Sequence, residues 1–173
     1  MINGASGGVG TFAVQIAKAF GAEVTGVCST RNVGMVRSIG ADHVIDYTQE
    51  DFTQSEQRYD LILDNVANHS LSDCRGVLTP QGTHIPNSGH AGMGYIIKAL
   101  VASLFVHRQG RTYLAIPNNE DLVVLKEFIE AGKIAPVIDT TYPLSETTEA
   151  FRYLDEGHAR GKIVISVEAN NQI

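Results

Sequence analysis

The 173-residue sequence contains no tryptophan and only two cysteines, Cys28 and Cys74. The cysteines lie far apart and in none of the short spacings that zinc sites use, so the sequence predicts neither a disulfide framework nor a metal centre. Free thiols buried in a reducing compartment are the expected state. We therefore expect a cytoplasmic location.

Long apolar runs and clusters of positive charge are also lacking. No apolar run reaches the roughly 18 residues of a transmembrane helix, and we expect no secretory signal peptide. Lysine and arginine number 13 against 19 acidic residues, a net charge of −6 without a basic block. Membranes and nucleic acids are therefore not expected partners. With 43% hydrophobic residues, the chain has enough apolar side chains for a packed core.

Short β-rich segments alternate with helical segments along the chain. Strands are expected at residues 1–3, 22–29, 43–47, 59–66, 81–88, 112–116 and 161–167. Helices are expected at 10–20, 32–39, 70–78, 92–107, 118–131 (with Asn118 or Asn119 as the N-cap) and, after a turn, within 142–157. This alternation is typical of an α/β protein with a Rossmann-type, doubly wound parallel sheet.

The pattern changes near Lys133. The segment "IAPVIDTTYPL" is extended and contains Pro136 and Pro143. We do not expect it to form another βαβ unit, and we place a domain boundary at this point.

A glycine-rich turn, "ASGGVG" at residues 5–10, lies between the first strand and the first helix. In the dinucleotide-binding pattern G-x-G-x-x-G, Ala5 replaces the first glycine, whereas Gly7 and Gly10 keep their places. Gly7 would let the backbone approach a pyrophosphate, and Gly10 would let the helix pack closely on the strand and direct its N-terminus at the phosphates. No Lys-Ser or Lys-Thr follows Gly10, which excludes a Walker-type loop. A tight turn that binds nothing is the alternative.

The second strand ends in Ser29, Thr30 and Arg31. A site for NAD(H) would have an aspartate or glutamate here to accept a hydrogen bond from the ribose 2′-hydroxyl. Two hydroxyls and a guanidinium suit a 2′-phosphate instead. The sequence therefore favours NADP(H) over NAD(H) as the cofactor. The alternative is a solvated arginine on a loop without a ligand.

Four segments together resemble a known group of enzymes. They are "INGASGGVGTFAVQIAKAFGAEVTGVCST", "SIGADHVIDY", "YDLILDNVANHSL" and "EGHARGKIVISV". This combination resembles the medium-chain dehydrogenase/reductase superfamily, in its quinone oxidoreductase-like branch, also described as zinc-type alcohol dehydrogenase-like. The resemblance covers essentially the whole chain and is far more specific than the glycine-rich turn alone.

Members of this superfamily have an N-terminal GroES-like catalytic domain and a Rossmann domain that binds the cofactor. The resemblance implies that residues 1–133 are the nicotinamide-dinucleotide-binding domain with a truncated first strand, and that the GroES-like domain is lacking. Residues 134–173 would be a tail that completes the missing domain. We therefore expect a fragment of a longer reductase, whose tail lies on the sheet, pairs with another copy or is poorly ordered.

The resemblance also implies roles for residues at matching positions. The residues implied to hold the pyrophosphate are Ser6, Gly7, Gly8, Val9 and Gly10. Those implied to lie near the 2′-phosphate are Ser29, Thr30, Arg31 and Tyr47. Those implied to lie near the nicotinamide end are Asn65, Val66 and Ala67, where alanine replaces a common glycine, together with Ser88 and Gly89. A lone histidine, His90, does not identify a proton donor, so the catalytic residues are unassigned.

In the parent enzyme, the resemblance implies hydride transfer between nicotinamide and a carbonyl, quinone or conjugated alkene. The fragment alone is expected to be inactive, and no metal is expected because the family's zinc ligands lie mostly in the missing domain. Family members often dimerise by pairing an edge strand, so a homodimer through residues 112–116 is expected. A non-catalytic nucleotide-binding or interaction module on the same scaffold is the alternative.

Overall fold

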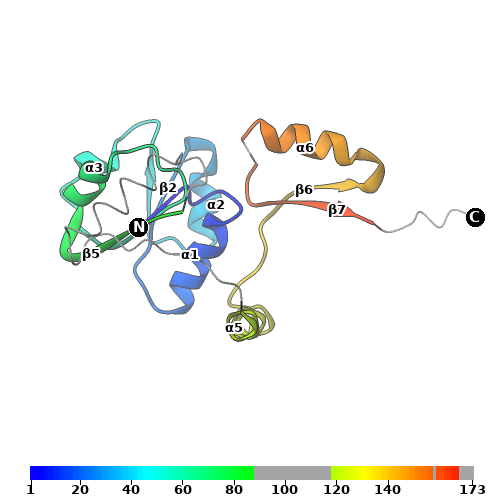
Figure 1. Cartoon of the computed structure of the whole chain (residues 1–173), viewed down its shortest axis with the longest axis horizontal. Helices are drawn as coiled ribbons and strands as arrows, with labels where there is room; N and C mark the ends of the chain where they lie inside the picture. The colour runs from blue at the N-terminus through cyan, green and yellow to red at the C-terminus, as the bar shows by residue number, and fades with distance from the viewer. Residues whose placement is uncertain (88–117, 158, 168–173) are drawn as a thin grey trace, which may run out of the picture.

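The computed structural model describes residues 1–87, 118–157 and 159–167, which form two sheets at opposite ends of the molecule (Figure 1). Within the described residues, the larger sheet has five strands in the order β3-β2-β1-β4-β5, and every neighbouring pair is parallel. Its strands are β1 (Ile2–Asn3), β2 (Thr25–Cys28), β3 (His43–Asp46), β4 (Tyr59–Asp64) and β5 (Leu78–Pro86). This is the strand order of a Rossmann-type sheet, as predicted from the sequence.

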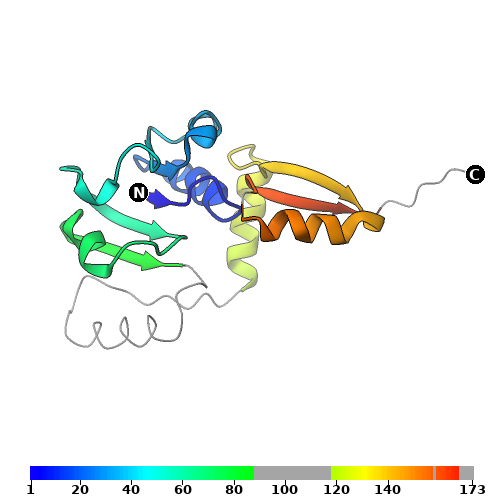
Figure 2. The ribbon, with the colours of Figure 1, turned by 90° about the horizontal axis from the view of Figure 1, so that it is seen from above.

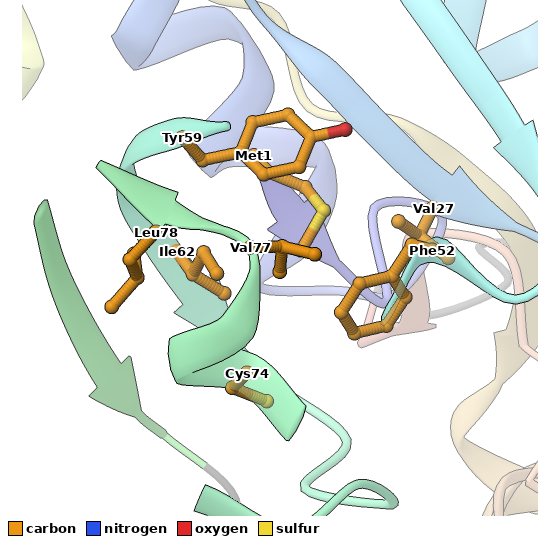
Figure 3. Close-up of a cluster of buried hydrophobic side chains, with 8 residues drawn as sticks. All are labelled: Met1, Val27, Phe52, Tyr59, Ile62, Cys74, Val77 and Leu78. Atoms are coloured by element: carbon orange, nitrogen blue, oxygen red, sulfur yellow. The ribbon is translucent and has the colours of Figure 1, made fainter. Parts of the chain in front are cut away.

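Helices lie on both faces of this sheet. They are α1 (Gly10–Ala19), α2 (Val33–Ser38) and α3 (Leu71–Gly76), with single 3₁₀ turns η1 (Thr30–Asn32) and η2 (Phe52–Gln54). Successive strand residues point to opposite faces, so Met1 and Val27 belong to one core cluster and Ile2 and Cys28 to the other. The cluster on the α3 side, which includes Ile62, is drawn in Figure 3. Each face of the sheet therefore carries a buried core cluster, as is typical of a parallel sheet.

The smaller sheet is formed by the C-terminal part of the chain. It consists of β6 (Ile138–Pro143) and β7 (Lys162–Ser166), joined through η3 (Leu144–Glu146) and α6 (Thr147–Asp155). Because β6 and β7 pair in parallel, this segment is a βαβ unit, and the expectation that it would not be one is wrong. Pro136 precedes β6 and Pro143 ends it, so neither proline interrupts the pairing. Strand β7 finds its partner within the same chain.

The remaining helix, α5 (Asn119–Glu130), leads into the loop near Lys133 where the sequence pattern changes. The Asn118 side chain caps it, accepting a hydrogen bond from the Asp121 backbone N–H at 2.8 Å, which confirms one of the two predicted caps. No described helix is long and apolar enough to cross a membrane. The expected helix at 92–107 and the expected edge strand at 112–116 lie outside the described residues.

Figure 2 shows α5 between the two ends of the molecule along its long axis. One of the contacts that join these ends is made by Gln15, a buried side chain of α1. The Gln15 amide donates to the Ala135 carbonyl at 2.9 Å, and its Oε1 accepts from the Ala135 N–H at 2.8 Å. Gln15 is only 8% exposed, and the neighbouring Ile134 is 2% exposed. The loop before β6 is therefore fixed against α1 by a paired, sheet-like contact.

We predict that Gln15→Ala lowers the free energy of unfolding by about 1–3 kcal/mol, because it removes both partly buried hydrogen bonds between the Gln15 side chain and the Ala135 backbone. Urea unfolding followed by circular dichroism measures this loss. Gln49→Ala is the matched control, since the Gln49 side chain is exposed and donates a hydrogen bond to its neighbour Thr48. A loss no larger than that of the control would contradict the prediction.

Candidate dinucleotide-binding site

The glycine-rich turn joins β1 to α1 at very short range. A Cβ atom on Gly10 would lie 2.1 Å from the Gly4 carbonyl oxygen and 2.7 Å from the Ala5 Cα. No side chain fits there, so the close packing of helix on strand that was expected at Gly10 is present. At Gly7 a Cβ would meet only the Gly4 oxygen, at 3.6 Å, so this position is open. No side chain of the described residues caps the N-terminus of α1, although the Thr11 N–H of its first turn already donates to the Gly7 carbonyl at 3.0 Å. An uncapped helix N-terminus of this kind suits an anion.

A cavity of about 590 Å³ lies in front of this turn, at the carboxyl ends of β1, β2 and β4. It brings together most of the predicted site residues: Ser6, Gly7, Gly8, Val9, Gly10, Ser29, Arg31, Tyr47, Asn65 and Val66. Thr30 lines an adjoining hollow of about 350 Å³ with Ser29, Arg31 and Tyr47. Ala67 lines neither, and Ser88 and Gly89 lie outside the described residues.

Several lining residues were missed by the sequence analysis. They are Asn3, Gly4, Cys28, Asn32, Asn68, Gly157 and Ala159. Asn32 joins the two halves of the site, because its Nδ2 donates to Ser6 Oγ at 3.1 Å and to Ser29 Oγ at 3.2 Å. Its Oδ1 is buried without a hydrogen-bond partner among the described residues. Asn32 directly follows the predicted phosphate-binding residues, which was the only signal in the sequence that could have identified it.

The C-terminal βαβ unit contributes one wall of the site. The Gly161 N–H donates to the Ser6 carbonyl at 2.9 Å, and a Cβ on Gly8 would lie 3.0 Å from both the Gly161 oxygen and Lys162 Nζ. Asp139 anchors this loop by accepting hydrogen bonds from Tyr153 Oη at 2.7 Å and from the Arg160 N–H at 2.9 Å. The tail is thus part of the site.

A buried polar network supports the turn after β4. Burial alone would raise the pKa of Asp64, but its hydrogen bonds outweigh this and lower the pKa to about 2. Its Oδ1 accepts from Asn3 Nδ2 at 2.9 Å, from the Ala67 N–H at 2.8 Å and from the Val66 N–H at 3.2 Å. His84 Nε2 lies 3.3 Å from the other oxygen. Since an ionised carboxylate can only accept, Nε2 carries the proton.

Comparison with known proteins identifies the family. A family described as zinc-binding dehydrogenase matches residues 39–165. The chain belongs to this family. It corresponds to the C-terminal part of proteins in the medium-chain dehydrogenase/reductase superfamily, and spans about half the length of the curated relatives it matches.

Two relatives and one solved structure illustrate this similarity. Mouse "NAD(P)H oxidoreductase RTN4IP1, mitochondrial" is 40% identical, over 96% of this chain and 47% of the mouse protein. The Arabidopsis thaliana "NADPH-dependent alkenal/one oxidoreductase, chloroplastic" is 33% identical, over 95% of this chain and 39% of that protein. The quinone oxidoreductase structure from Coxiella burnetii has a TM-score of 0.81 at 30% identity, over 96% of this chain and 52% of that one.

The family's name raises the question of zinc. Within the described part of this zinc-binding dehydrogenase chain, one group offers three donor atoms within 4.8 Å of one another: Asp64, Cys74 and His84. Burial, together with nearby carboxylates, raises the pKa of the Cys74 thiol to about 12, so it stays protonated. Asp64 already accepts four hydrogen bonds, including one from His84. A protonated thiol and a carboxylate that is already occupied by four hydrogen bonds do not fit a zinc ion.

Ala67 is the described non-glycine residue with a positive φ, 57°. It lies in the turn after β4, where the resemblance implied that alanine replaces a common glycine. The alanine therefore destabilises the fold through backbone strain, since a left-handed conformation is disfavoured by about 1–2 kcal/mol in a residue with a Cβ.

We predict that Ala67→Gly raises the free energy of unfolding by about 0.5–1 kcal/mol, the relief of strain exceeding the added flexibility of the unfolded chain. Thermal unfolding by calorimetry measures the change. Ala22→Gly, at an exposed position without a positive φ, is the control and should not stabilise the chain. Equal effects of the two substitutions would show that the conformation of Ala67 is not strained.

The buried Asp64 carboxylate also predicts an acid dependence of stability. Its folded-state pKa is lowered from 3.8 to about 2, so its contribution is complete above about pH 4 and is lost as the pH falls towards 2. This contribution amounts to about 2 kcal/mol. Urea unfolding between pH 5 and 2 should show a shallower acid loss for Asp64→Asn than for the unmodified chain. Asp60→Asn, at an exposed position of β4, controls for the removal of one carboxylate.

Proposed function

We propose that this chain is the NADP(H)-binding part of a zinc-independent oxidoreductase that transfers hydride between nicotinamide and a carbonyl, quinone or conjugated alkene. The observation that carries this proposal is the cavity of about 590 Å³ between the uncapped N-terminus of α1 and the carboxyl ends of β1, β2 and β4. In an open α/β sheet this edge is where a dinucleotide binds.

The residues that line the cavity suit the pyrophosphate, the ribose and the nicotinamide half of such a ligand. The glycine-rich turn offers the pyrophosphate an open backbone at Gly7 and a helix N-terminus that no described side chain caps. The buried Asn32 Oδ1, which has no partner among the described residues, can accept a hydrogen bond from a ribose hydroxyl or a bound water. The turn at Asn65 and Val66 lies across the sheet from Ser29, so it would face the nicotinamide half.

The preference for NADP(H) rests on the adjoining hollow of about 350 Å³. Its lining residues are Ser29, Thr30, Arg31 and Tyr47, none of which is acidic. The hydroxyls and the guanidinium can bind a 2′-phosphate, whereas a carboxylate would be needed to favour the 2′-hydroxyl. One relative carries NADPH in its name and another carries NAD(P)H, which supports a nicotinamide cofactor and agrees with this preference.

In this proposal the bound cofactor supplies the hydride, and the chain binds and orients it. Cys28, Arg31 and Tyr47 are the titratable side chains among the described residues that line the cavity. All three lie at or next to the end of β2 or β3, on the side proposed for the 2′-phosphate, and burial raises the pKa of the Cys28 thiol to about 11. The described lining of the cavity therefore offers no acid or base for the substrate. This favours binding without turnover, as in the alternative of a non-catalytic nucleotide-binding module. Substrate contacts would come from the other half of the parent protein.

Two further expectations, the cellular location and the oligomeric state, are not tested by the cavity. The cytoplasmic location expected from the sequence stays a prediction, and two relatives carry "mitochondrial" and "chloroplastic" in their names. The homodimer expected through residues 112–116 concerns a segment outside the described residues and also stays a prediction.

Isothermal titration calorimetry of the chain with NADPH and NADH tests the proposal. We expect saturable binding that is tighter for NADPH, and we expect Arg31→Ala to weaken NADPH binding about 10- to 100-fold while NADH binding changes little, because a charge-assisted contact to the phosphate is lost. Arg37→Ala, in the last turn of α2, is the matched control. Tighter NADH binding, or no binding of either cofactor by a folded sample, would refute the proposal.

A further inference from the structure

His84 is a buried titratable residue that lies behind the cavity. It is 2% exposed on β5, and it does not line the cavity. Its hydrogen bond goes to Asp64, which is fully buried at the end of β4. An apolar residue would fill this position without the cost of burying a polar ring, so the imidazole calls for an explanation beyond packing.

The two oxygens of Asp64 face different partners. Oδ1 accepts three hydrogen bonds, two of them from the backbone N–H groups of Val66 and Ala67 in the turn. The described partner of Oδ2 is His84. The last torsion of an aspartate is soft, so a contact on Oδ2 fixes the plane of the carboxylate. With Oδ2 held towards β5, Oδ1 stays directed at the turn.

The turn held in this way forms one wall of the cavity. Asn65, Val66 and Asn68 line it, whereas Ala67 does not. Asn68 is tied to the same network, because its Oδ1 accepts from Asn3 Nδ2 at 3.1 Å. The position of this wall therefore depends on Asp64, and the orientation of Asp64 depends on His84.

We propose that His84 is a positioning residue for the nicotinamide half of the dinucleotide, acting through Asp64 on the turn at residues 65–68. This inference rests on the proposed function. It predicts that the two halves of the ligand respond differently to a change at residue 84. The turn follows β4, whereas the hollow proposed for the 2′-phosphate follows β2, and β1 lies between these strands.

The test compares two ligands in calorimetric titrations of the chain: NADPH and adenosine 2′,5′-bisphosphate, which lacks the nicotinamide half. We expect His84→Leu to weaken NADPH binding about 10-fold, the effect of losing roughly one hydrogen bond, and to change the binding of the bisphosphate less than 2-fold. His84→Gln, whose amide can donate to Asp64, should restore NADPH binding to within about 3-fold of the unmodified chain.

His43→Leu is the matched control, since His43 is an exposed histidine at the start of β3 that pairs with Glu23. Equal weakening of both ligands by His84→Leu, no weakening of either, or failure of His84→Gln to restore binding would overturn the inference while leaving the proposed function intact. An unmodified chain that binds neither ligand would overturn the proposed function, and the inference with it.

A measurement on the unmodified chain covers the case in which His84→Leu does not fold. In heteronuclear NMR, NADPH should shift the amide signals of Val66 and Ala67 and the imidazole signals of His84, whereas adenosine 2′,5′-bisphosphate should leave all three in place. If NADPH leaves these signals unchanged, or if both ligands shift them equally, His84 does not position the nicotinamide half.

Discussion

The contact between Gly10 and the carbonyl of Gly4 is the constraint on which the site depends. Because only a hydrogen atom fits between them, α1 begins directly above the end of β1, and its uncapped N-terminus opens onto the carboxyl edge of the sheet. The same carbonyl belongs to a left-handed glycine, with a φ of 74°, whose Cα lies against Val66. One backbone approach therefore sets the positions of the helix and of the turn after β4.

Local patterns in the sequence were sufficient to predict most of the larger sheet. The glycine spacing, the β-rich segments and the Asn118 cap all depend on residues close together in the chain, so they could be recognised without a structure. The pairing of β6 with β7 could not, because it joins segments about twenty residues apart and the two prolines looked like interruptions. Asn32 was missed for a similar reason: its partners, Ser6 and Ser29, come together only after β1 and β2 have paired.

The carboxyl edge of the sheet is unusually polar for a buried region. Asn3, Asp64 and His84 are all less than 5% exposed and come from three neighbouring strands. Burying these groups is costly, and the cost is offset because each group finds partners at the strand ends. Such a network fixes one arrangement of the turn more strictly than apolar packing would, since a displaced donor would leave a buried charge unsatisfied. Sequence patterns could not predict it, because it depends on strand register.

The hydrogen bond from Gly161 to Ser6 has a consequence for how the whole chain responds to a ligand. It joins the pyrophosphate turn to a loop of the C-terminal unit, so two walls of the cavity belong to parts of the chain that are far apart in the sequence. A ligand that contacts both walls stabilises the association of the two parts. By thermodynamic reciprocity, any interaction that stabilises this association raises the affinity for the ligand by the same factor. The ligand affinity of this site therefore also reports how stably the C-terminal unit packs against the pyrophosphate turn.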